Sequence, residues 1–310
     1  MTREEQQAIL TISLMAAFAD GAKDDRERSE VKRIAESLSD SDINVSALYQ
    51  DVLLKRRSLE DTAAAIGAPE LRQYAYEMAV CVCDADGAHV PAEKDFLDRL
   101  RSALGLDAAS SDAFAEQAAV VAAAPLAAST PAEPALAATM SGAEMDKMIL
   151  NYAILNGALE LLPQNLASVA IIPLQMKMVY RIGRAHGFEL DRGHVRDFLA
   201  TLGVGLTSQY LEQFGRKLLG GILGQVAGGI GRGIGRSATS VAFSFATTYA
   251  LGHVAKGYYA GGRTLSADLL KRSFDSMLGE ARGLQSRYLP EIEQKARTLD
   301  VSQVLQSIRQ

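Results

Sequence analysis

The chain lacks residues on which several classes of protein depend. Only two of its 310 residues are cysteine, and none is tryptophan. Cys81 and Cys83 are one residue apart, a spacing that suits neither a zinc knuckle nor a redox C-x-x-C motif. We therefore expect two reduced, buried cysteines and no disulfide scaffold.

An excess of positive charge is also absent. Lysine and arginine number 32 against 37 aspartate and glutamate, which gives a net charge of −5. Nucleic-acid-binding domains usually carry a basic surface, so we expect no nucleic-acid partner. The first residues, MTREEQQAIL, have acidic side chains where a signal peptide needs positive charge and an apolar core. We expect a cytoplasmic protein.

Apolar residues are plentiful and recur at helical spacing along the chain. They make up 48% of the sequence, enough to bury a core. We predict an all-α protein in three parts. These are a helical bundle over residues 1–106, a linker rich in alanine and proline over 107–142, and a glycine-rich helical domain over 143–310. The linker contains a short predicted helix near residues 112–122.

One sequence motif occurs twice in the first third of the chain. DGAKDDRE, from Asp20 to Glu27, aligns with DGAHVPAE, from Asp86 to Glu93. In each copy Asp-Gly is a helix-end signal and the glutamate falls in the first turn of the next helix. The sequence therefore predicts a duplicated helix–loop–helix hairpin.

The acidic residues of the two copies have two interpretations. Asp beside Gly can end a helix, and Glu in a first turn can accept hydrogen bonds from free backbone N–H groups. Alternatively, the carboxylates converge and bind a hard divalent cation such as Ca²⁺. The predicted ligands are Asp20, Glu27, Asp86 and Glu93. We expect no other cofactor.

The segments AFADGAKDDRE and CDADGAHVPAE resemble the TerB-like domain associated with tellurite-resistance and stress operons of bacteria. The resemblance covers roughly residues 1–106. It implies a compact helical bundle with an acidic surface that binds a divalent metal at the four residues above. It does not imply a known enzymatic activity. We expect another stress-operon protein as a partner.

A glycine-rich run from Gly215 to Gly262 dominates the second half. Glycines four residues apart share one helix face and allow a close approach of another backbone, a glycine zipper. Each interior glycine costs a helix about 1 kcal/mol relative to alanine, so tight packing against protein or lipid must compensate. The predicted contact residues are Gly220, Gly224, Gly228, Gly231 and Gly235. Residues 218–231 would span only about 21 Å as a helix, so we expect shallow insertion or a packed hairpin.

A predicted helix before this run carries a basic face formed by Lys177, Arg181 and Arg184. These side chains can be the solvated side of a core helix. Alternatively, they can meet the head groups of a membrane surface.

The segments LQMKMVYRIGRAHG and TTYALGHVAKGYYAGG resemble the YcjF-type membrane-associated domain of unknown function. The resemblance covers about residues 146–262. It implies association with the inner membrane through the glycine-rich helices, and a GTPase partner.

No motif in the sequence combines a nucleophile, a base and an orienting group, so we expect no enzyme. Our hypothesis is a bacterial stress-associated adaptor, in which an acidic helical domain is tethered to a membrane-associating helical domain. The alternative is a soluble helical scaffold whose glycine-rich helices self-associate into a homo-oligomer.

Overall fold

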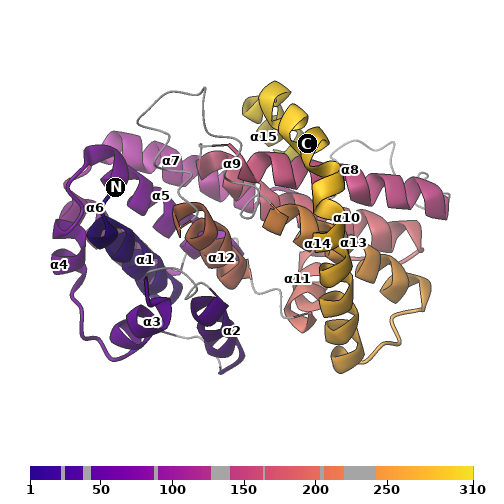
Figure 1. The fold of residues 1–310 in the computed structure, drawn as a ribbon, viewed down its shortest axis with the longest axis horizontal. Helices are drawn as coiled ribbons and strands as arrows, with labels where there is room; N and C mark the ends of the chain where they lie inside the picture. The colour runs from indigo at the N-terminus through magenta and orange to yellow at the C-terminus, as the bar shows by residue number, and fades with distance from the viewer. Residues whose placement is uncertain are drawn as a thin grey trace. The chain divides into compact units, whose positions relative to one another are not determined.

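The computed structural model describes residues 1–21, 25–37, 43–86, 90–126, 140–162, 165–202, 206–219 and 242–309. These ranges contain helices and no strand, which confirms the all-α fold (Figure 1). By its contacts the chain forms two compact units. Unit 1 is Met1–Ala123 with Gly205–Ser237, and unit 2 is Ala124–Val204 with Ala238–Gln310. The three-part division expected from the sequence stays a prediction.

Unit 1 is built around the contact between its first and fifth helices. Its elements are α1 (Arg3–Ala17), α2 (Asp25–Ser37), α3 (Val45–Leu53), α4 (Leu59–Ala64), α5 (Pro69–Cys83), the 3-10 helix η1 (Asp84–Asp86), α6 (Pro91–Leu104), α7 (Ala108–Ala122) and α12 (Leu206–Leu219). α1 contacts α5, and each carries fully buried apolar side chains, such as Ile12 on α1 and Met78 on α5. Cys81 and Cys83 lie on α5, where both are buried and neither forms a disulfide, as the sequence predicts.

Local hydrogen bonds fix where α1 begins. Thr2 Oγ1 accepts from the Glu5 N–H at 3.1 Å, and the Thr2 N–H donates to Glu5 Oε2 at 2.8 Å. This capping box satisfies backbone groups that the first helical turn leaves open. The bond from Thr2 lowers the pKa of the Glu5 carboxyl, and the Gly67 N–H, at 3.3 Å, lowers it further. Glu5 thereby ties the start of α1 to the segment before α5.

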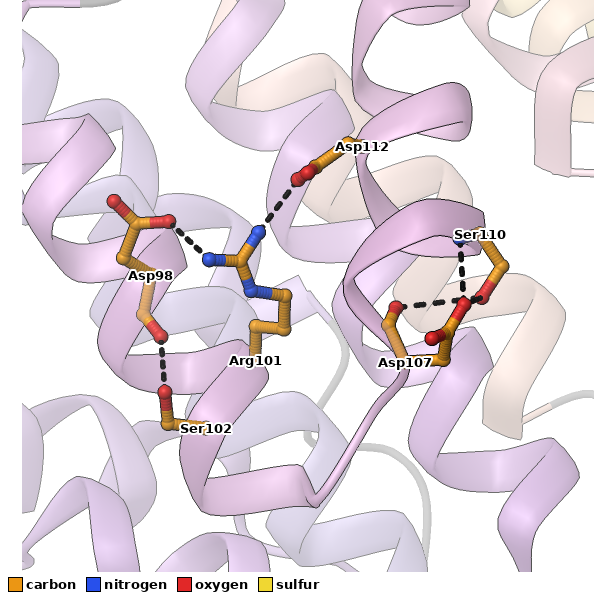
Figure 2. A network of polar contacts seen from close by, with 6 residues as sticks. All are labelled: Asp98, Arg101, Ser102, Asp107, Ser110 and Asp112. Atoms are coloured by element: carbon orange, nitrogen blue, oxygen red, sulfur yellow. Dashed lines mark hydrogen bonds and ion pairs between the residues drawn. The ribbon is translucent and has the colours of Figure 1, made fainter.

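Arg101 joins α6 to α7 (Figure 2). Its guanidinium donates to Asp98, one turn earlier on α6, at 2.9 Å and to Asp112 of α7 at 2.5 Å. Gly105 ends α6 with a φ of +63°, which glycine adopts without strain. Asp107 then caps α7 by accepting from the Ser110 N–H at 3.0 Å. The first part of the stretch expected as a linker is therefore a helix of unit 1.

Unit 2 is centred on α13. Its helices are α8 (Gly142–Glu160), α9 (Asn165–Val169), α10 (Ile171–Ala185), α11 (Arg192–Thr201), α13 (Ala242–Ala260), α14 (Ala267–Thr298) and α15 (Val301–Arg309). α13 contacts α8, α10 and α14. A cluster of fully buried residues, formed by Ala153, Ala158, Phe245 and Ile292, lies where α8, α13 and α14 meet.

α8 and α13 bury a polar layer between apolar ones. Thr248 Oγ1 accepts from Asn156 Nδ2 and from Gln175 Nε2, both at 3.0 Å. One turn away, Glu160 Oε2 accepts from the Ser244 N–H at 2.8 Å. All of these side chains are buried. A slip of one helix along the other would leave buried donors unpaired, so the layer fixes the register of α8, α10 and α13.

Two glycines let α8 pack closely on its neighbours. A Cβ added at Gly252 would lie 2.6 Å from Cγ2 and 3.2 Å from Cβ of Ile149. A Cβ added at Gly157 would lie 3.2 Å from Cβ of Phe245. Unit 2 therefore uses glycines for close helix contacts, at positions that the sequence analysis did not select.

The substitution Gly252→Ala is expected to lower the free energy of unfolding by about 1–3 kcal/mol, because its methyl group collides with the branched carbon of Ile149. Gly257→Ala, in the same helix, is the control, because an added Cβ there meets nothing within 4 Å. This variant should be neutral or up to about 1 kcal/mol more stable through its higher helix propensity. Denaturant unfolding measures both, and equal stabilities would contradict the close contact.

His253 on α13 gives unit 2 a dependence on pH. Its Nδ1 lies 3.8 Å from Asp146 Oδ1, and its ring is 4.4 Å from that of Tyr249. Burial lowers the pKa of His253, since it disfavours the imidazolium. Asp146 and Glu280 partly offset this lowering of the pKa, whereas Lys256 adds to it.

Because the folded pKa of His253 is lowered, the unfolded chain takes up this proton first as the pH falls. The contribution to stability is present above the ordinary histidine pKa of about 6.5 and is lost as the pH falls below it. We expect wild type to lose more stability than His253→Gln between about pH 7.5 and pH 5. Unfolding curves at both pH values measure the difference, and parallel losses would refute this role of His253.

Candidate functional site

Unit 1 contains both predicted hairpins. α1 and α2 form the first, and α5, η1 and α6 form the second. Gly21 has a φ of +66°, the left-handed conformation expected of a glycine at the end of the first helix. Pro91 opens α6, where its missing N–H costs nothing. Residues 22–24 and 87–89, within the two loops, lie outside the described residues.

The four predicted metal ligands are placed only in part. Asp20 follows α1 and is partly buried, and Glu93 lies in the first turn of α6. Glu27 belongs to α2 and Asp86 to η1, but their side chains lie outside the described part of the structure. Among the described side chains, no three His, Cys, Asp or Glu residues group closely enough to hold a metal ion. The divalent-cation site stays a prediction.

Glu93 has the helix-capping contact that the first interpretation of the acidic residues requires. Its Oε2 accepts from the Val90 N–H at 2.9 Å. This bond satisfies a backbone group at the helix start that has no partner within the helix.

α12 lies across both hairpins. It contacts α1 and α2 of the first and α5 and η1 of the second (Figure 1). Gln6 Nε2 of α1 donates to the Leu218 carbonyl near the end of α12, at 3.4 Å. We call the surface of α1, α2, α5 and η1 that α12 contacts the hairpin seam. Residues 206–219 are therefore the functional candidates that the sequence analysis missed.

The buried side chains of α12 are both apolar and polar. Tyr210 and Leu218 are 2% and 0% exposed. Glu212, also buried, accepts from Arg216 one turn later at 2.6 Å. Gln213 is 2% exposed, and neither its amide nitrogen nor its oxygen has a hydrogen-bond partner within the described ranges. A buried polar group without a partner costs about 1–3 kcal/mol. Burial of the apolar side chains therefore stabilises the docked α12, and burial of the Gln213 amide destabilises it.

The predicted basic face lies on α10. Lys177 Nζ donates to the Ser307 carbonyl in the last turn of α15, at 3.2 Å, and so offsets the negative end of that helix. Arg181 is exposed and Arg184 is partly exposed. Buried apolar residues, including Met178 and Ile182, occupy the other side of α10. All three predicted cations are thus at least partly exposed, and Lys177 is held by its bond to α15.

Most of the predicted contact surface in the glycine-rich run cannot be compared with the structure. Gly220, Gly224, Gly228, Gly231 and Gly235 all lie outside the described residues. Within the described ranges, no helix combines the length and the apolar character needed to cross a membrane.

Residues 1–118 match a family described as "Protein of unknown function (DUF533)". The TerB-like family is related to it, so the N-terminal resemblance holds at this coarser level. The matched range ends within α7 and does not include α12. Nothing supports a YcjF-type domain in the C-terminal half. No curated protein and no solved structure matches the chain.

Substituting Glu93 separates the two roles of the acidic residues. In EDTA, Glu93→Ala is expected to lower the free energy of unfolding by about 1 kcal/mol, because the Val90 N–H loses its acceptor. Lys94→Ala, in the same exposed turn, is the control and should change little. Calcium chloride should stabilise wild type but not Glu93→Ala if the cation site exists. Wild-type stability that calcium leaves unchanged would rule that site out.

Proposed function

We propose that this protein is a non-enzymatic adaptor. Unit 1 binds a helix in the hairpin seam, and the second half of the chain attaches it to an anionic membrane surface. The position of α12 carries the proposal, because it is a helix from a distant part of the sequence that lies across both hairpins. A surface that holds one helix in this way has the form of a helix-binding groove.

The membrane half of the proposal rests on α10 and on the glycine-rich sequence. Arg181 and Arg184 present positive charge beside each other at one-turn spacing. Cations on an amphipathic helix strengthen its attraction to anionic lipid head groups. We therefore place the protein at the cytoplasmic face of the inner membrane. A GTPase or another stress-operon protein, as the resemblances imply, stays the hypothesis for its partner.

Vesicle flotation tests the membrane half. We expect the full chain to float with vesicles of phosphatidylglycerol and phosphatidylcholine, and high salt to weaken the binding because it screens the charges. The pair Arg181→Glu and Arg184→Glu should reduce flotation severalfold. The pair Arg272→Glu and Arg282→Glu, exposed on α14, makes the same change in net charge and should float like wild type. A wild-type chain that stays at the bottom of the gradient would refute attachment to an anionic membrane surface.

A soluble self-associating scaffold is the second candidate. The contacts of Gly157 and Gly252 favour it, since they show that glycines of this chain pack against protein. A scaffold of this kind would not float with vesicles and would form oligomers without detergent. Light scattering on the flotation samples distinguishes it from the adaptor.

A further inference from the structure

We infer that the hairpin seam is an exchangeable helix site, which α12 occupies in its own chain and which α12 of a second copy of this chain occupies in exchange. The inference rests on the proposed function and deepens it, because it names the helix that unit 1 binds.

The seam belongs to a module that is recognisable without α12. α1, α2, α5 and η1 all lie within residues 1–118, the range that matches the family of unknown function. α12 begins at Leu206, far beyond that range. It is therefore an added occupant, joined to the module by noncovalent contacts and by the intervening chain.

The way α12 is held favours local opening. Tyr210 and Leu218 supply apolar burial, but the amide of Gln213, which has no hydrogen-bond partner among the described residues, opposes it. Elements whose burial carries such a penalty open at a lower free energy than the core around them. α1 and α5 contact each other and bury mostly apolar side chains, although the Tyr74 hydroxyl of α5 also has no hydrogen-bond partner among the described residues. α12 can thus leave the seam while the hairpins stay folded.

We take a second copy of this chain as the occupant because it carries the same α12, whose contacts with the seam are known from the single chain. Its α12 makes the same contacts in trans as in cis, and only the connection differs. The covalent connection gives the cis helix a high effective concentration, so exchange increases with protein concentration. Reciprocal exchange fills both seams and closes a two-fold dimer.

Hydrogen exchange on the full wild-type chain tests the opening. We expect the amides of α12 to exchange at least about tenfold faster than those of α1 and α5. Gln213→Leu should slow exchange in α12, because it removes the unpartnered amide, and Gln294→Leu, exposed on α14, should not. Equal exchange rates in α12, α1 and α5 would overturn the inference. That result would not contradict the proposed membrane attachment, which the flotation experiment tests separately.

A labelled peptide of residues 206–219 tests the seam itself. Leu218→Asp places a charge at a fully buried position and should therefore displace α12 from the hairpin seam of its own chain. This chain should bind the peptide at least about tenfold more tightly than wild type does, because no cis helix competes. The Gln213→Leu chain should bind the peptide most weakly, because its own α12 is docked more stably in the seam. The same peptide carrying the Leu218→Asp change is the control and should not bind.

Failure to bind, with the helicity of the Leu218→Asp chain retained in circular dichroism, would overturn the inference and the helix-binding half of the proposed function together. Light scattering then tests the exchange between copies. The wild-type dimer fraction should rise with concentration, and Leu218→Asp should stay monomeric. A wild-type chain that is monomeric at every concentration, although the variant binds the peptide, would overturn exchange with a second copy.

Discussion

Burial of α12 against both hairpins is the constraint on which our account of this protein depends. The hairpins contain two copies of one sequence motif; the first brings α1 and α2 to the seam, and the second brings α5 and η1. α12 contacts elements of both copies, and so adds a further link to the direct contact between α1 and α5. Because α12 comes from the second half of the chain, unit 1 includes a helix that is distant in sequence from the two hairpins. Unit 1 is therefore completed by a helix from beyond the matched family range.

The two hairpins could be predicted because their signals are local. Asp-Gly at a helix end, Pro91 at a helix start and Glu93 in the first turn each act over a few residues, and the repeat doubles the evidence. The docking of α12 could not be predicted in this way. Its apolar pattern indicates a helix with a buried side. The pattern within one segment does not indicate which distant part of the chain packs against that side.

The glycines of unit 2 show the same limit. The density of glycine led to a prediction of contacts at residues 220–235, whereas close contacts within the described residues include those of Gly157, before the run, and Gly252, near its end. What distinguishes Gly252 is the β-branched Ile149 on the facing helix, which is a property of the pairing and not of either sequence. The buried layer of Asn156, Gln175 and Thr248 is similar, since the Thr248 hydroxyl accepts from amides on two other helices. Polar pairing and close contact together fix how α8, α10 and α13 pack.

The central claim is that α12 occupies the seam between the hairpins. The most direct measurement is a comparison of hydrogen exchange between wild type and Leu218→Asp, read helix by helix. If α12 covers the seam, unseating it should raise exchange in α1, α2 and α5 together, while α4 keeps its wild-type rates. Unchanged exchange in α1, α2 and α5, with α12 itself exposed, would contradict the account.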